Sequence, residues 1–348
     1  MTSATIILLL VMLAVLSAFL TWWLISGRSS LQLVDTPNHR SLHSVPVPRS
    51  GGIAVVLCLL LGLLLVNWRF NSTDNIVPLL VAILVIAGCS FLDDLKGLSV
   101  LVRLLVHIVA VAFLLFAGYR LTDIGLPGLS ITLVPFLSML VSVIFIIWSI
   151  NMYNFMDGMD GFAAGMTVFG FSTFALLGVF SGHSVFATCN LVVVASVLGF
   201  LFFNFPPAKI FLGDTGSSVL GLCFGAITIW GVNEQVFSFW VAMLVFSPFL
   251  VDATYTLIRR ICAGERFWEA HKSHFYQRLV EKGYGHKKVV LGEYLLMILC
   301  AFSALIMNLN SSAKTVQLIG ILCAMALYTL LIIALNRHLG RHITNDRS

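Results

Sequence analysis

Charged residues are scarce in this chain. Only 10% of its 348 residues are charged and 59% are hydrophobic, whereas a soluble protein carries about 25% charged residues. This scarcity excludes a soluble globular fold. The polar–apolar alternation of membrane barrel strands is also missing, because the apolar runs are continuous and about 20 residues long. The sequence therefore predicts an all-α integral membrane protein made of spanning helices.

Disulfide and metal-binding cysteine motifs are missing as well. The seven cysteines stand singly, without a CxxC pair or a Cys/His cluster. We interpret them as small buried hydrophobic residues. The first apolar segment has no basic residues ahead of it and exceeds the length of a signal-peptide core, so we expect it to remain as a spanning helix.

About eleven spanning helices are predicted from the apolar runs, forming a polytopic bundle. They cover residues 4–26, 51–67, 75–92, 98–118, 131–150, 161–181, 185–204, 215–231, 236–257, 290–308 and 315–335. If the N-terminus is periplasmic, only Arg69, Arg120 and Lys314 of the 20 Lys and Arg residues fall in periplasmic loops. Because Lys and Arg concentrate in cytoplasmic loops, this orientation is favoured, with the C-terminus cytoplasmic.

The cytoplasmic segments are then 27–50, 93–97, 151–160, 205–214, 258–289 and 336–348. Asp93 and Asp94 end the third predicted helix, where the helix dipole and their mutual repulsion disfavour them. A nearby cation or metal would explain this pair, and a solvated helix end is the alternative.

The segment NMYNFMDGMDG, residues 151–161, supplies two carboxamides and two carboxylates. Asn151 and Asn154 are three residues apart and share a helical face. Asp157 and Asp160 project from the glycine-containing turn that follows. Such oxygen ligands suit Mg²⁺ or Mn²⁺, and an Asx-rich turn is the structural alternative.

The segment FLGDTGS, residues 211–217, opens the eighth predicted helix. Asp214, Thr215 and Ser217 could simply cap that helix. Alternatively, its N-terminus offers free N–H groups to a phosphate. Asp214 would then hold a metal that bridges the phosphate, and Phe211 could stack on a base.

Two further cytoplasmic segments carry basic and imidazole side chains. The Pro-rich first segment has four that suit an anionic substrate, although it could also be a mere linker: His39, Arg40, His43 and Arg49. In WEAHKSHFYQRL, His271 and His274 could share a helical face, with Arg278 one turn further on. Zinc would need more ligands, so we favour phosphate contact or acid–base chemistry for these three.

Acids that suit a divalent cation and basic groups that suit phosphates thus share one membrane face. A metal-dependent phosphoryl or sugar-phosphate transferase acting on a lipid fits this pattern. A transporter or lipid flippase is the alternative, but transporter sites lie near the bilayer midplane, often between repeated halves. The sequence has no midplane charge pair and no obvious repeat, which favours the enzyme. A non-catalytic scaffold is a third possibility.

The four motifs, in this order, resemble those of the polyprenyl-phosphate N-acetylhexosamine-1-phosphate transferases, also known as glycosyltransferase family 4. The resemblance covers the chain from Asp35 to Arg278, and NxxNxxDGxDG followed by FLGDTGS is its most specific part. The first loop and HKSHFYQRL most resemble the O-antigen-initiating branch. The peptidoglycan enzyme has three successive His and a DDxxK motif, and here Lys96 comes one place early.

This resemblance implies that residues 1–348 form one transmembrane transferase domain in the bacterial inner membrane. The implied reaction moves a sugar 1-phosphate from a UDP-sugar to undecaprenyl phosphate and releases UMP, initiating O-antigen or another cell-surface polysaccharide. The sugar would be an N-acetylhexosamine or a 6-deoxy-N-acetylhexosamine. Another phosphodiester product stays open within the same superfamily. A homodimer is implied as possible, and no nucleic acid partner is expected.

The resemblance also assigns roles to individual residues. Asp214, with Asn154, would bind Mg²⁺ or Mn²⁺, and Asp93 and Asp94 would lie near the acceptor phosphate. The remaining assigned residues would contact the donor: Asn151, Asp157, Asp160, Phe211, His271, His274, Arg278 and Arg49. Direct attack by the lipid phosphate is favoured over a covalent intermediate, because a phosphate monoester is largely dianionic at neutral pH.

Overall fold

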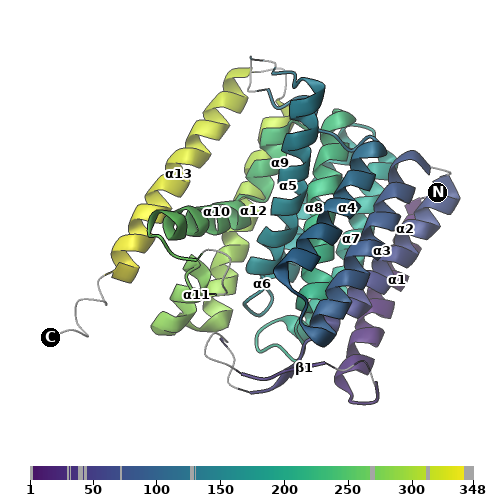
Figure 1. Cartoon of the computed structure of the whole chain (residues 1–348). Helices are drawn as coiled ribbons and strands as arrows, with labels where there is room; N and C mark the ends of the chain where they lie inside the picture. The colour runs from purple at the N-terminus through teal and green to yellow at the C-terminus, as the bar shows by residue number, and fades with distance from the viewer. Residues whose placement is uncertain are drawn as a thin grey trace.

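The computed structural model describes residues 3–29, 31, 33–37, 42, 45–70, 73–125, 129, 131–266, 271–310 and 314–340. Within these ranges helices dominate (Figure 1). The elements are α1 (Ser3–Ile25), β1 (Val34–Asp35), β2 (Val47–Pro48), α2 (Gly51–Phe70), α3 (Thr73–Lys96), α4 (Val100–Phe116), α5 (Pro135–Phe155), α6 (Phe162–Phe180), α7 (Ser184–Asn204), α8 (Gly213–Asn233), α9 (Phe239–Val245), α10 (Ser247–Cys262), α11 (Phe275–Leu279), the π-helix η1 (Val280–Tyr284), α12 (Gly285–Leu309) and α13 (Lys314–Gly340).

Nine helical segments within the described residues are long and apolar enough to cross a membrane. This confirms the predicted class, an all-helical polytopic membrane protein. α4 coincides with the predicted segment 98–118, but its 17 residues make it shorter than the other spans. Each of the eleven predicted segments coincides with a helix or a helix pair. The number of crossings and their orientation stay predictions.

The prediction of one helix over residues 236–257 is wrong. α9 ends at Val245, α10 begins at Ser247, and the two helices are bent by 84°. Pro248 lies in the first turn of α10, where its missing N–H costs nothing, but a proline cannot continue a preceding helix. α10 therefore runs across its neighbours in Figure 1 instead of alongside them.

α8 is the most enclosed of the described spans, because 94% of its apolar 18-residue stretch is buried. It packs against α2, α3 and α5. Small residues allow this close approach. A Cβ atom added at Gly52 of α2 would lie 2.3 Å from the backbone nitrogen of Gly216 in α8. The two helices therefore touch backbone to backbone.

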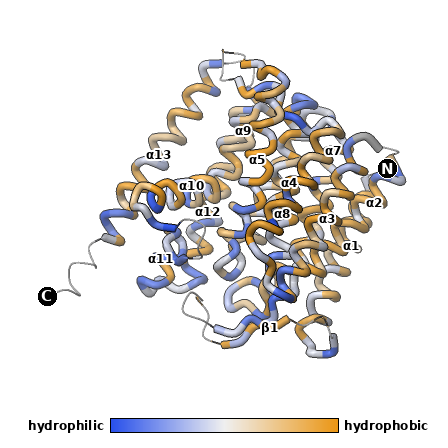
Figure 2. The backbone as a smooth tube through the Cα atoms, viewed as in Figure 1, coloured by the Kyte–Doolittle hydropathy of each residue, from blue (hydrophilic) through white to orange (hydrophobic). Residues whose placement is uncertain are grey.

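Hydrophilic segments gather around β1 and α11, at one end of the bundle (Figure 2). There the Phe211 N–H donates to the Pro48 carbonyl (2.7 Å), which ties the first loop to the residues ahead of α8. The Tyr276 hydroxyl of α11 donates to the Phe155 carbonyl at the end of α5 (2.9 Å). Segments that are distant in sequence thus meet where the predicted motifs lie.

We expect Gly52→Ala to destabilise the bundle by about 1–3 kcal/mol, because the added methyl group overpacks a backbone contact. Gly88→Ala in α3 is the matched control, since a methyl group there meets nothing within 4 Å. Thermal unfolding in detergent, followed by circular dichroism, compares both variants with the wild type. Equal melting temperatures for the two variants would contradict the backbone contact between α2 and α8.

Candidate active site

Asp94, near the end of α3, binds the first turn of α8. Its Oδ1 accepts a hydrogen bond from the Asp214 N–H (3.2 Å). Its Oδ2 accepts from the Thr215 N–H (3.0 Å) and from the Thr215 hydroxyl (2.7 Å). The buried Asp94 carboxylate therefore caps α8. The expectation that α8 caps itself is wrong, and the N–H groups of Asp214 and Thr215 are not free for a phosphate.

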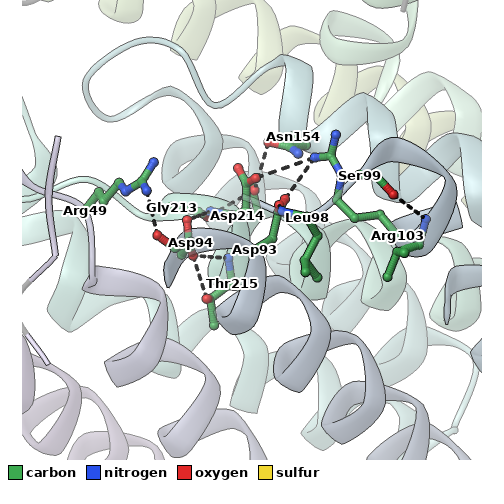
Figure 3. Close-up of polar contacts among 12 residues, drawn as sticks. Arg49, Asp93, Asp94, Leu98, Ser99, Arg103, Asn154, Gly213, Asp214 and Thr215 are labelled. Atoms are coloured by element: carbon green, nitrogen blue, oxygen red, sulfur yellow. Dashed lines mark hydrogen bonds and ion pairs between the residues drawn. The ribbon is translucent and has the colours of Figure 1, made fainter. Parts of the chain in front are cut away.

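Asp93 and Asp214 lie beside this cap, and both face the guanidinium of Arg103 (Figure 3). The Arg103 guanidinium donates to Asp93 Oδ2 (3.0 Å) and lies 3.8 Å from Asp214 Oδ2. The Asp93 and Asp214 carboxyl groups also lie against each other. Asp93 Oδ1 accepts from the Leu98 N–H (2.6 Å). Arg103 thus offsets part of the repulsion between adjacent carboxylates.

Two cavities adjoin this acidic cluster. The larger, of about 270 Å³, is lined by seven of the predicted site residues: Arg49, Asp94, Asn154, Asp157, Asp160, Phe211 and Asp214. The smaller, of about 90 Å³, is lined by Arg103 and four predicted residues: Asp93, Asn151, Asn154 and Asp214. Both cavities are bordered by Asn154 and Asp214, which therefore lie at their junction.

The turn between α5 and α6 brings two more carboxylates to the larger cavity. Burial, followed by the nearby charges of Asp214 and Asp94, raises the pKa of Asp157 well above its usual value. A carboxyl group in this position holds its proton unless a cation neutralises its surroundings.

Asp160 is held on both sides of its carboxylate. Its Oδ1 lies 3.0 Å from Nδ1 of His286, and its Oδ2 accepts from the Ala208 N–H (3.0 Å). Asn204 completes the support, because its Oδ1 accepts from the Gly161 N–H (2.9 Å) and its amide nitrogen donates to a carbonyl ahead of α8 (2.9 Å). The acidic turn is thereby fixed to the loop between α7 and α8.

The imidazole-bearing segment starts differently from the prediction. The Asp252 carboxylate of α10 accepts from the N–H groups of Phe275 (2.9 Å) and Tyr276 (3.2 Å). α11 therefore begins directly after His274. Because His271 and His274 both precede the helix, the prediction that they share a helical face is wrong.

The described residues that line the two cavities do not include His271, His274 or Arg278. Gln277, from the same segment, does line the larger cavity. Burial, followed by His274 and Arg260, lowers the pKa of His271 to about 4, so its ring is neutral at neutral pH. Contact of the three residues with a donor stays a prediction.

Four residues that the sequence pattern did not single out support the site: Arg103, Asn204, Asp252 and His286. Arg103 and Asp252 are charges inside apolar runs, and such charges need partners. That signal was available in the sequence. Three residues predicted to suit an anionic substrate lie outside the described residues: His39, Arg40 and His43.

The donor atoms at the cavity junction fit a divalent cation. The described residues contain no group of three or more His, Cys, Asp or Glu that could hold a metal. Asp214 and Asn154 nevertheless offer a carboxylate and a carboxamide to the same cavity, which Asp157 also lines. Mg²⁺ often takes one or two carboxylates and completes its shell with water and substrate phosphates. An oxygen-only set of this kind suits Mg²⁺ or Mn²⁺.

Comparison with known proteins identifies a family and several relatives of this chain. The profile described as glycosyl transferase family 4 matches residues 76–232, which contain the acidic motifs. A probable undecaprenyl-phosphate N-acetylglucosaminyl 1-phosphate transferase of Bacillus subtilis is 32% identical, over 79% of this chain and 77% of the relative. A decaprenyl-phosphate N-acetylglucosaminephosphotransferase of Mycolicibacterium smegmatis is 29% identical, over 93% and 87%.

A phospho-N-acetylmuramoyl-pentapeptide-transferase of Staphylococcus saprophyticus is 27% identical, over 70% of this chain and 79% of the relative.

The fold and the site define a polytopic membrane protein with an acid-lined polar site at one end of its helices. The chain belongs to glycosyl transferase family 4. The O-antigen branch stays a prediction, since none of these three relatives carries that description.

We expect Asp94→Ala to lower the free energy of unfolding by about 1–2 kcal/mol, because buried donors of α8 lose their acceptor. Asp94→Asn should lose less, since it keeps one acceptor oxygen. Asp214→Ala, which removes a like charge from the cluster, should not destabilise. Thermal unfolding of the three variants tests this, and equal losses from Asp94→Ala and Asp214→Ala would contradict the capping role.

We expect Asp157→Asn to stabilise the protein at pH 7.5. The raised pKa means that the folded state keeps this proton after the unfolded chain has released it. The carboxyl group therefore lowers stability as pH rises above its ordinary pKa of about 4. The advantage of the variant should disappear below about pH 4. Denaturation at several pH values tests this, with the exposed Asp123→Asn as control. An advantage independent of pH would contradict the assignment.

Proposed function

We propose that this protein transfers a sugar 1-phosphate from a UDP-sugar to undecaprenyl phosphate and releases UMP. The product would be an undecaprenyl-pyrophosphate-linked sugar that initiates O-antigen or another cell-surface polysaccharide. In this proposal the site faces the cytoplasm, where nucleotide sugars are available. The excess of Lys and Arg in the predicted cytoplasmic segments supports that orientation.

The meeting of two cavities at Asn154 and Asp214 carries the proposal. A phosphoryl transfer between two anionic substrates needs both phosphates beside the same charge-neutralising groups. The larger cavity, with Phe211, Asp157 and Asp160, suits a nucleotide sugar. The smaller cavity, with Arg103, suits the phosphate of a lipid acceptor.

The transfer itself needs no proton movement. An oxygen of the acceptor phosphate attacks the phosphorus that bears the sugar, a P–O bond forms, and the bond from that phosphorus to UMP breaks with its electron pair. Both oxygens of Asp94 accept hydrogen bonds from α8, and Asp93 is engaged with Arg103 and Leu98. These contacts favour positioning roles for the pair over a role as general base, which supports direct attack by a largely dianionic phosphate.

Asp214 and Asn154 would hold Mg²⁺ or Mn²⁺, with Asp157 nearby. When bound, the cation neutralises charge on the pyrophosphate and polarises the phosphorus under attack. Arg49 is oriented toward the same cavity by its hydrogen bond to the Asp94 carbonyl (2.6 Å). A second guanidinium near the donor would add to the charge neutralisation.

N-acetylglucosamine is the first sugar to test, because two of the relatives described above are named for its transfer. A 6-deoxy-N-acetylhexosamine is the second. The relatives named for undecaprenyl and decaprenyl phosphate support a polyprenyl phosphate as acceptor.

We expect purified protein with undecaprenyl phosphate, Mg²⁺ and a UDP-N-acetylhexosamine to release UMP. EDTA should abolish the release, and Asp214→Ala should reduce it on the order of 100-fold or more, because the site loses transition-state charge stabilisation. A coupled assay for UMP measures the rate for a panel of UDP-sugars.

Asp123→Ala, in the connection between α4 and α5, is the control and should keep wild-type activity. No UMP from any donor, in folded protein that binds UDP-sugars, would reject the transferase and favour the transporter or flippase. Activity that survives both EDTA and Asp214→Ala would reject the metal assignment.

A further inference from the structure

His286 joins three segments at the wall of the larger cavity. It lies in the first turn of α12, and its Nδ1 is 3.0 Å from Asp160 Oδ1. Both side chains are largely enclosed, with 19% and 12% exposed. The backbone of Leu42 in the first loop lies against the imidazole. The Asp160 carboxylate is the nearest partner of Nδ1, whose other contact is the Asp160 N–H at 3.4 Å.

Asp160 extends this connection to a fourth segment. Its Oδ2 accepts from the Ala208 N–H in the loop between α7 and α8 (3.0 Å). One imidazole–carboxylate pair therefore links the first loop, the acidic turn, the α7–α8 loop and the start of α12. Without the imidazole, Asp160 Oδ1 would lose its nearest partner in a cavity that is already rich in acidic side chains.

The pair also forms a boundary between two spaces. Leu42, Asp160, Phe211 and His286 line the larger cavity of the candidate active site. The same four residues line a neighbouring cavity of about 710 Å³ that extends toward Lys287 and Lys288. The contact between His286 and Asp160 therefore lies in the wall that the two cavities share.

We propose that His286 is a positioning residue for the nucleotide sugar, which clamps Asp160 and the first loop around the donor. This inference rests on the proposed function. The other end of the first loop is held independently, because Pro48 accepts from the Phe211 N–H. Loss of His286 therefore frees Leu42 and the Asp160 carboxylate, while Asp214 and Asn154 keep their places.

The test compares His286→Ala, His286→Gln and the control Lys287→Ala in full-length protein. In His286→Ala the KM for the UDP-sugar should rise about tenfold, because Asp160 is no longer held in the geometry that receives the donor. The kcat and the KM for undecaprenyl phosphate should stay within about twofold of wild type. His286→Gln should recover most of the donor affinity, because a carboxamide offers two N–H donors. Lys287 is exposed, and no described contact joins it to Asp160 or Leu42. Its variant should therefore match wild type.

Amide hydrogen exchange supplies a readout that is independent of activity. Exchange in residues 157–161 should be faster in His286→Ala than in Lys287→Ala. Unchanged exchange would overturn the clamp. A fall in kcat alone, or equal changes in both KM values, would overturn the role in donor binding.

Wild-type protein that releases no UMP would reject the proposed function and the donor role with it. The exchange contrast would still report whether the clamp itself exists. The two failures are therefore distinguishable.

Discussion

The N-terminus of α8 imposes the constraint on which the site depends. The first N–H groups of any helix lack intrahelical acceptors, and α8 is enclosed by other helices along nearly all its length. Asp94 satisfies two of these groups from the end of α3. This joint fixes the ends of two helices together and, by doing so, places Asp93 against Asp214. The concentration of negative charge follows from how the buried helix is capped.

Accumulated carboxylates need cations, and the described residues provide few beside them. Arg103 serves Asp93 and Asp214 from one side, and Arg49 approaches from the other. Burial, followed by the charges of Asp214 and Asp94, raises the pKa of Asp157. A site of this kind favours a divalent cation together with anionic substrates, since each relieves the charge of the other. The family membership and this electrostatic argument are independent of one another.

The sequence predicted the helices better than it predicted their polar contacts. Continuous apolar runs specify spans, because backbone groups in lipid must be bonded within a helix. The break between α9 and α10 was signalled by Pro248, but the length of the apolar run concealed it. The cap of α8 could not be predicted, because Asp94 is 120 residues away from Asp214 in the chain. The start of α11 likewise depends on Asp252 from another helix. Long-range pairings of this kind leave no local pattern.

The enclosure of α8 bears on how the protein is made. α8 has the lowest mean hydropathy of the nine described candidate spans and the largest buried share. Such a segment is a poor match for lipid and a good match for a protein interior. Its main partners, α2, α3 and α5, all precede it in the chain. During synthesis from the N-terminus, the surfaces that receive α8 exist before it emerges. Because its partners come earlier in the chain, the least apolar of these spans can pack against them as soon as it enters the bilayer.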